Sequence, residues 1–430
     1  MVITGRMVLV AAIAALVVLV RPDWTVVTLW VVAMVLLWGI DAMRATRPSE
    51  LHFSRDGATS VRASEPAELQ LRLTNNSNKT FRGTVRDAWP PSLEMTPSRH
   101  LAALEPQGRR TLSARVRSSR RGTRSPDRVT VRSLGPWRLS GWQQSRQLPW
   151  RIDVLPAFDS RRHLPSKLAQ LRDLEGRSVV LHRGQGTEFD SLREYVGGDD
   201  VRSIDWRATA RASDVMVRTW RPERDRHVVI VLDCGRTSAG RVGDAPRLDA
   251  SIEATLLLTA LAARAGDRID VLAWDRGIRG AAHGRADGEA LRSTTSMLAH
   301  VQPSLLETDW DALQIEIARR ARQRSLVVLL SSLDPAPVRS GLLPVIPQLT
   351  RRHVVMIGAV SDPSVTEMLR ARSDLSTTYR AAAAAGFTTE RRSVGTELVH
   401  RRVEVVDAPP EQLAPALADR YLALKAAGRL

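Results

Sequence analysis

Cysteine is almost absent from this chain of 430 residues, and lysine is nearly as rare. The single cysteine, Cys234, excludes an internal disulfide framework and a zinc site built from cysteines. None of the three lysines lies in the Gly-x-x-x-x-Gly-Lys pattern that cradles nucleotide phosphates. The patterns His-Glu-x-x-His and Gly-x-Ser-x-Gly are also missing. Because no catalytic motif is present, we expect the protein not to be an enzyme.

Aromatic residues make up only 4% of the chain, whereas positive charge is abundant, with a formal net charge of +17. Between Leu51 and Arg151 there are 19 Arg or Lys and 7 Asp or Glu, a net charge of +12. Proteins that bind single-stranded nucleic acid interleave aromatic side chains with cations, so no nucleic-acid partner is expected. The basic segment is either a solvated sheet face or a surface that attracts anionic lipid headgroups.

Two apolar runs stand near the N-terminus, Met7–Val20 and Trp24–Ile40, with Arg-Pro-Asp between them. A membrane-spanning helix needs about 17–25 predominantly apolar residues, so the second run qualifies and the first is short. We expect residues 1–47 to form a transmembrane hairpin, with helices over about 7–20 and 24–40. A signal peptide is the alternative, although no small-residue cleavage site follows Val20.

The cations beside these runs predict an orientation. Arg6 precedes the pair, and Arg44 and Arg47 follow it. The positive-inside rule then places both termini and the soluble domains in the cytoplasm. The expected location is a multi-pass protein of the cytoplasmic membrane.

Residues 50–156 alternate apolar and polar side chains over short runs, which is typical of half-buried strands. The clearest runs are Glu68–Thr74, Thr111–Arg117 and Arg128–Arg132. Glycine, proline and asparagine punctuate them. This pattern predicts a small, basic, antiparallel β-sandwich.

Residues 226–430 alternate strands and helices. Strands are expected over 227–232, 268–274, 326–330, 354–360 and 403–406, and helices over 248–265, 289–301, 310–322 and 411–427. Such alternation predicts a doubly wound α/β domain, whose ligands bind at the carboxyl ends of the strands.

Residues 157–225 join the two halves and contain a dense run of charges after a polar helix over 166–177. Its characteristic residues are Glu188, Phe189, Arg193, Glu194, Tyr195, Gly198, Asp199, Asp200, Arg202, Asp205, Trp206 and Arg211. Carboxylates alternating with guanidinium groups predict an ion-pair network rather than a catalytic pair. Val201, Ile204 and Ala208 share one face of a helix that Asp199 or Asp200 can cap.

The run from Gly186 to Arg211, followed by Arg218 and Pro222, resembles the signature of the domain of unknown function 58 (DUF 58) family. The resemblance implies a bacterial membrane protein whose C-terminal half is similar to a von Willebrand factor A domain. Relatives are often encoded beside MoxR-type AAA+ ATPases. It therefore implies a membrane-anchored scaffold for such an ATPase in envelope assembly or maturation. The alternative is an enzyme or nucleotide-binding protein that uses the same strand ends.

Von Willebrand A domains hold Mg²⁺ in three loops, and the resemblance carries these loops to this chain. Asp233, Thr237 and Thr308 match ligand positions. Gly235 replaces a ligating serine, and Ser332 stands at the position of an aspartate, with Asp334 two residues later. Mg²⁺ binding is therefore expected to be weak or absent. The charged residues of the same loops, Arg236, Glu307 and Asp309, are the expected docking residues for a partner.

Overall fold

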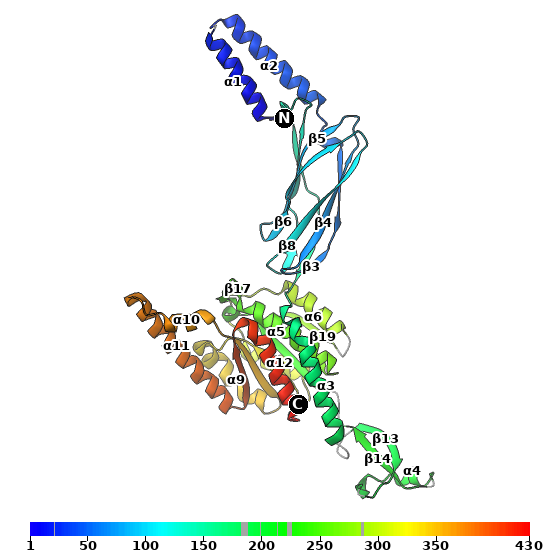
Figure 1. The fold of residues 1–430 in the computed structure, drawn as a ribbon. Helices are drawn as coiled ribbons and strands as arrows, with labels where there is room; N and C mark the ends of the chain where they lie inside the picture. The colour runs from blue at the N-terminus through cyan, green and yellow to red at the C-terminus, as the bar shows by residue number, and fades with distance from the viewer. Residues whose placement is uncertain (21, 182–187, 198, 213, 222–225, 285–287) are drawn as a thin grey trace. The chain divides into compact units, whose positions relative to one another are not determined.

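The computed structural model describes residues 1–20, 22–181, 188–197, 199–212, 214–221, 226–284 and 288–430 (Figure 1). The chain divides into two compact units, Met1–Ala157 and Phe158–Leu430. Of the predicted residues, Gly198 lies outside the described residues.

Two helices begin the first unit, α1 (Gly5–Val20) and α2 (Trp24–Arg44). Among the described helices, only the one that starts at Trp24 is long and apolar enough to cross a membrane. The 16 residues of α1 span about 24 Å, less than the roughly 30 Å of a bilayer core. The expected multi-pass location, with both termini in the cytoplasm of a bacterium, is therefore wrong. A signal sequence near the N-terminus would pass the same length and composition test.

The rest of the first unit consists of three sheets. Their strand orders are β1-β11-β10-β5-β7, β2-β4-β8-β6 and β3-β12-β9. The strands are β1 (Val2–Ile3), β2 (Leu51–Gly57), β3 (Ser60–Arg62), β4 (Pro66–Asn75), β5 (Phe81–Ala88), β6 (Leu93–Thr96), β7 (Arg99–Leu104), β8 (Arg109–Ser118), β9 (Gly122–Arg124), β10 (Arg128–Leu134), β11 (Ser140–Arg146) and β12 (Ile152–Leu155). The strands expected from alternation are confirmed as β4, β8 and β10. Along β8, Leu112, Ala114 and Val116 are buried and the residues between them are exposed.

The end of α2 is fixed to the β-sheets by Asp41, a fully buried carboxylate. Its two oxygens accept hydrogen bonds from the backbone N–H groups of Trp137, Leu139 and Ser140, each at 2.8 Å. Trp137 and Leu139 lie in the turn between β10 and β11, and Ser140 is the first residue of β11. The strand β1 also pairs with β11, so both ends of the helical pair join the same sheet.

The second unit contains a six-stranded sheet with the order β19-β18-β15-β20-β21-β22. The strands are β15 (His227–Asp233), β18 (Arg268–Trp274), β19 (Ile278–Gly284), β20 (Leu326–Leu330), β21 (Val354–Val360) and β22 (Val403–Ala408). All neighbours are parallel except β18 and β19, which are antiparallel. Strands expected over 268–274, 326–330 and 354–360 are confirmed with those bounds.

Helices cover both faces of this sheet. They are α5 (Arg247–Arg264), α6 (Glu289–His300), α7 (Trp310–Arg320), α9 (Leu343–Thr350), α11 (Leu375–His400) and α12 (Pro410–Ala426), with α3 (Leu164–Leu181) before the sheet. The helix α10 (Pro363–Arg370) packs against α11 and buries no residue. Residues Val228, Ile230 and Leu232 of β15 share one core with α5 and α12. The alternate residues Val229 and Val231 share the other core with α7, α9 and α11. A strand buried on both faces must be continuously apolar, as residues 228–232 of β15 are.

Candidate functional site

Asp233 ends β15 and is the centre of a polar cluster at the carboxyl edge of the sheet. One carboxylate oxygen accepts hydrogen bonds from Gly235 N at 2.8 Å and Thr308 Oγ1 at 2.5 Å. The other oxygen accepts from Thr237 Oγ1 at 3.1 Å and Ser331 Oγ at 2.6 Å. Only 3% of the residue is exposed. The structure thus brings the predicted Asp233, Thr237 and Thr308 together and adds Ser331, which follows β20.

Glycine is required at position 235 by this close approach. A β-carbon there would lie 2.2 Å from Thr308 Oγ1 and 3.0 Å from Asp233 Oδ1. Any side chain, serine included, would therefore push the Thr308 loop away from Asp233. Because Thr308 contacts Asp233 directly, only glycine fits at position 235, and the ligating serine of the family pattern is absent.

A cavity of about 60 Å³ opens beside this cluster, between the loops after β15 and β20 and the start of α7. It has room for a few water molecules. Its rim carries the exposed ion pair Arg236–Glu307, with 3.0 Å between Nη2 and Oε1. Beside Glu307, Leu305 and Leu306 are 79% and 50% exposed. We call Arg236, Leu305, Leu306 and Glu307 the strand-edge surface.

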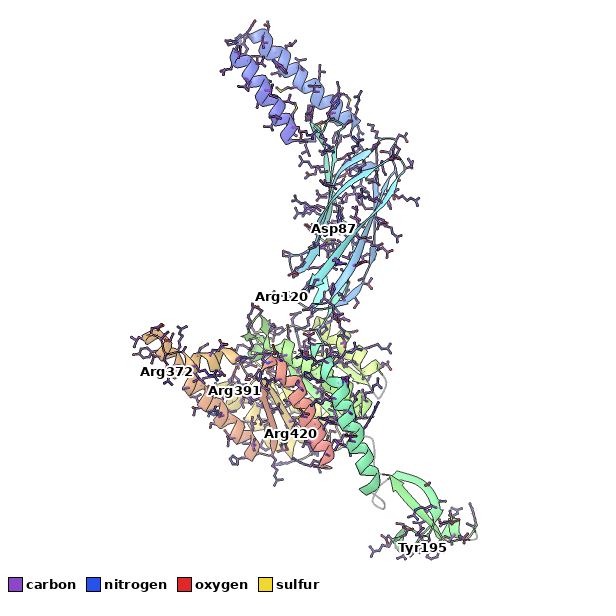
Figure 2. All side chains as sticks on the ribbon, in the orientation of Figure 1. Asp87, Arg120, Tyr195, Arg372, Arg391 and Arg420 are labelled. Atoms are coloured by element: carbon purple, nitrogen blue, oxygen red, sulfur yellow. The ribbon has the colours of Figure 1, made fainter. Side chains whose placement is uncertain are left out.

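Two of the predicted site residues have other roles. Asp334 makes ion pairs with Arg247 at 2.8 Å and Arg391 at 3.5 Å, and it does not line the cavity. Arg391, a buried residue of α11 that is labelled in Figure 2, also pairs with Asp407. Ser332 lines the cavity but offers no charge. Asp334 is therefore engaged by two guanidinium groups rather than by the cluster around Asp233.

Asp309 caps the helix α7, because its side chain accepts a hydrogen bond from Ala312 N at 2.9 Å. Its backbone is also held, since its N–H donates to Asp275 and its carbonyl accepts from the Trp274 indole. Substituting an N-cap aspartate costs about 1 kcal/mol of stability. Changing Asp309 would therefore perturb the fold as well as any docking.

Mg²⁺ needs oxygen ligands in octahedral geometry and usually at least one or two carboxylates. Here the one carboxylate of the cluster already accepts four hydrogen bonds, and the Arg236 guanidinium lies on the same cavity. No group of three or more His, Cys, Asp or Glu among the described residues could hold a metal ion. The residues of this cluster do not fit a tight Mg²⁺ site.

Calorimetric titration of the full chain with Mg²⁺ is expected to reveal no sub-micromolar site, because Gly235 and Ser332 supply no charged ligand. The variant Asp233→Ala is the control and should give the same small heats. A tight site that disappears in Asp233→Ala would contradict this account.

The charged run forms a separate hairpin of β13 (Glu188–Glu194) and β14 (Met216–Arg221), with the short helices η3 (Val201–Ser203) and α4 (Trp206–Thr209) between them (Figure 1). Arg193 binds Asp199 through two hydrogen bonds, and Arg218 binds Asp205. The predicted ion-pair network is confirmed at these two pairs.

The continuous helix expected over this run is wrong, because Asp205 begins a new helix instead. Its carboxylate caps α4 by accepting from Arg207 N and Ala208 N at 3.0 Å. The Ala208 N–H and then the Arg218 guanidinium hold the pKa of Asp205 below its usual value. Some apolar side chains of the hairpin are nevertheless exposed, Val201 at 63% and Trp206 at 69%.

The remaining predicted residues of the run lie around this hairpin. Glu188 and Phe189 are in β13, Tyr195 follows it, and its backbone N–H donates to Val215. Asp200 caps η3 by accepting from Arg202 N at 2.9 Å. The side chains of Glu194, Arg202 and Arg211 are exposed.

Sequence reasoning missed Leu305 and Leu306, and it did not predict the hydrogen bond from Ser331 to Asp233. The available signal for the two leucines was a pair of large apolar residues in a polar stretch between two predicted helices. Ser331 follows an apolar strand directly, at the same edge as Asp233, so its position after β20 was also a usable signal.

Residues 191–370 match the family model described as "Protein of unknown function DUF58". Uncharacterized proteins of Mycobacterium tuberculosis (strain ATCC 25618 / H37Rv) and Mycobacterium bovis (strain ATCC BAA-935 / AF2122/97) are 26% identical over 202 residues. The match covers 45% of this chain and 61% of the length of those relatives.

Two of the solved structures that resemble this chain match about a quarter of it. A segment of Escherichia coli alpha-2-macroglobulin from domain MG7 to the C-terminus matches with a TM-score of 0.21 and 19% identity, over 24% of this chain and 16% of that one. A CARDB domain from Pyrococcus furiosus matches with a TM-score of 0.18 and 14% identity, over 24% and 86%. These TM-scores are too low to indicate a shared overall fold.

Proposed function

We propose that this chain, whose residues 191–370 match the DUF58 family model, is a non-enzymatic protein-interaction protein that docks a partner on the strand-edge surface. The partner that the family resemblance implies is a MoxR-type AAA+ ATPase, and the process is envelope assembly or maturation. We propose a von Willebrand A-like fold for the sheet of the second unit. The sheet is parallel except for the antiparallel edge strand β19, and this arrangement supports that assignment.

The observation that carries the proposal is the exposure of Leu305 and Leu306 beside an ion pair at the carboxyl edge of the sheet. Open α/β sheets bind ligands at this edge. Apolar side chains give a docking surface its affinity, while a charged rim gives orientation and partner choice. The hydrogen bonds of Asp233 hold the loops that carry Arg236 and Glu307 against each other, which keeps the surface preorganised.

The alternative, an enzyme or nucleotide-binding protein, finds less support at the same edge. Pockets for small molecules usually have volumes of about 300–1,000 Å³, and the cavity here measures about 60 Å³. Both oxygens of Asp233 are engaged by neighbouring hydroxyl groups, so the carboxylate is poorly placed to act as a base. A purified full chain that binds or hydrolyses ATP would favour this alternative.

We also propose that the chain is attached to a membrane through α2. Its run of apolar side chains faces outward, with Leu29, Val32 and Val35 all exposed. Exposed apolar faces of this length are stable in lipid rather than in water.

Capture of a purified MoxR-type ATPase of the same organism by the immobilised full chain tests the docking proposal. Leu306→Asp is expected to weaken capture roughly tenfold or more, because a buried charge replaces an apolar contact. The matched control is Val399→Asp on α11, at the opposite end of the strands, which should capture as the wild type does.

Arg236→Glu should weaken capture mainly at low salt, since exposed charges act over about 10 Å at 0.1 M ionic strength. Circular dichroism checks that the variants fold. Equal capture by Leu306→Asp and the wild type would place the partner elsewhere, and the exposed Trp206 on the hairpin is then the next surface to test.

A further inference from the structure

Cations and indole rings surround the point where α2 enters the β-sheets. The residues are Arg44, Arg47, Lys79, Trp137, Arg138 and Trp142, and we call them the collar. The guanidinium carbon of Arg44 lies 5.5 Å from the Trp137 ring centroid, and that of Arg47 lies 5.9 Å from the Trp142 ring centroid. Side chains from α2, from the loop after it and from the β10–β11 turn therefore interleave.

The charge of the collar is not neutralised by these contacts. Arg44 and Arg47 lie over rings, and Lys79 Nζ donates to the carbonyl oxygen of Met43 at 2.6 Å. Of the nearby carboxylates, Asp41 is buried and already accepts three backbone N–H groups, and Glu50 accepts the backbone N–H of Arg47 at 3.2 Å. The four cations of the collar are all exposed, so they form a positive surface at the end of an apolar helix.

The collar is held at a fixed position at the end of α2, because hydrogen bonds fix this helix to the β-sheets. Asp41 fixes the helix end to the β10–β11 turn, and the Trp142 indole donates to Ala42 O at 2.9 Å. Ser140 Oγ donates to Trp38 O at 2.8 Å. Cleavage after α2, as for a signal sequence, would remove Asp41 and leave buried N–H groups of the turn without acceptors, which is costly.

We propose that the collar binds the headgroups of anionic phospholipids around α2. This inference rests on the proposed membrane attachment. Tryptophan rings settle at the level of the headgroups, and arginine and lysine beside a membrane helix are attracted to anionic lipid. Indole rings and cations stand together here at the end of an apolar helix, which is the combination that suits the surface of an anionic bilayer.

The test uses the full chain reconstituted in phosphatidylcholine vesicles that contain spin-labelled lipid. The ratio of association of labelled phosphatidylglycerol to labelled phosphatidylcholine is measured by electron spin resonance. We expect the wild type to prefer phosphatidylglycerol by at least about threefold at low salt, with the preference shrinking as salt is added. The triple variant Arg44→Gln, Arg47→Gln, Arg138→Gln should bring the ratio close to one.

The matched control is Arg86→Gln, Arg99→Gln, Arg115→Gln, which removes the same charge from exposed positions along β5, β7 and β8. It should keep the wild-type ratio. If the collar variant keeps the wild-type ratio, or if the control loses the preference to the same extent, the collar does not bind anionic headgroups. If an alkaline wash removes the chain from the vesicles, the proposed membrane attachment through α2 is wrong, and so is the lipid binding that rests on it.

Discussion

Replacing Asp87 by alanine is expected to lower the free energy of unfolding of the first unit by about 3–5 kcal/mol. Asp87 Oδ1 lies 2.5 Å from Arg55 Nη2, and the two side chains are only 2% and 1% exposed (Figure 2). Burial lowers the pKa of Arg55, and the negative charge of Asp87 opposes that shift. Without Asp87, the buried guanidinium would lose its counter-charge.

Amide hydrogen exchange along β5 and β10 measures this loss in the full chain, because these strands report the opening of the unit. Asp127→Ala is the matched control, since the Asp127–Arg128 pair is exposed and contributes about 0–1 kcal/mol. The double variant Arg55→Met, Asp87→Leu should recover most of the stability, because it leaves no buried charge. Equal protection in Asp87→Ala and Asp127→Ala would contradict the account.

Asp41→Asn is expected to destabilise the same unit by about 3 kcal/mol, since unsatisfied buried donors cost about 1–3 kcal/mol each. The amide keeps the shape of the carboxylate but turns its NH₂ group toward one of the backbone donors, at Trp137 or Leu139 and Ser140. Exchange should rise first in the β10–β11 turn and in the last turn of α2.

Asp56→Asn is the control for Asp41→Asn, because Asp56 is 56% exposed and pairs with the exposed Arg72. It should leave the exchange of the turn unchanged. If Asp41→Asn also leaves the turn protected, then α2 does not depend on this carboxylate, and the argument against cleavage after α2 fails.

Continuous apolar strands were predictable from the sequence, and the edge strand β19 was not. The strands β20 and β21 are apolar throughout, and so are residues 228–232 of β15, because helices cover both faces of the sheet. The edge strand β19 contains Gly280 and Gly284, where a β-carbon would lie within 3 Å of Met297 and Ala290 of α6. Its small residues let α6 pack closely against the strand. They also replace the large apolar residues by which a strand is recognised in a sequence.

The part of the site that lies at the ends of adjacent strands was predictable from the sequence. Asp233 and the residues after β20 meet because adjacent parallel strands end at one edge. The ion pair between Asp334 and Arg391 was not predictable. Arg391 comes from α11, a helix whose polar, alanine-rich sequence carries no clear periodicity. The same applies to Asp41, whose donors lie about a hundred residues further along the chain.

The most direct test of the docking proposal is site-specific photo-crosslinking. A photoreactive phenylalanine analogue is placed at position 306 of the full chain, or at position 399 as the control, and the purified MoxR-type ATPase is added. The account predicts a crosslinked product from position 306 that excess unmodified chain suppresses, and none from position 399. Crosslinking from position 399 but not from position 306 would contradict it.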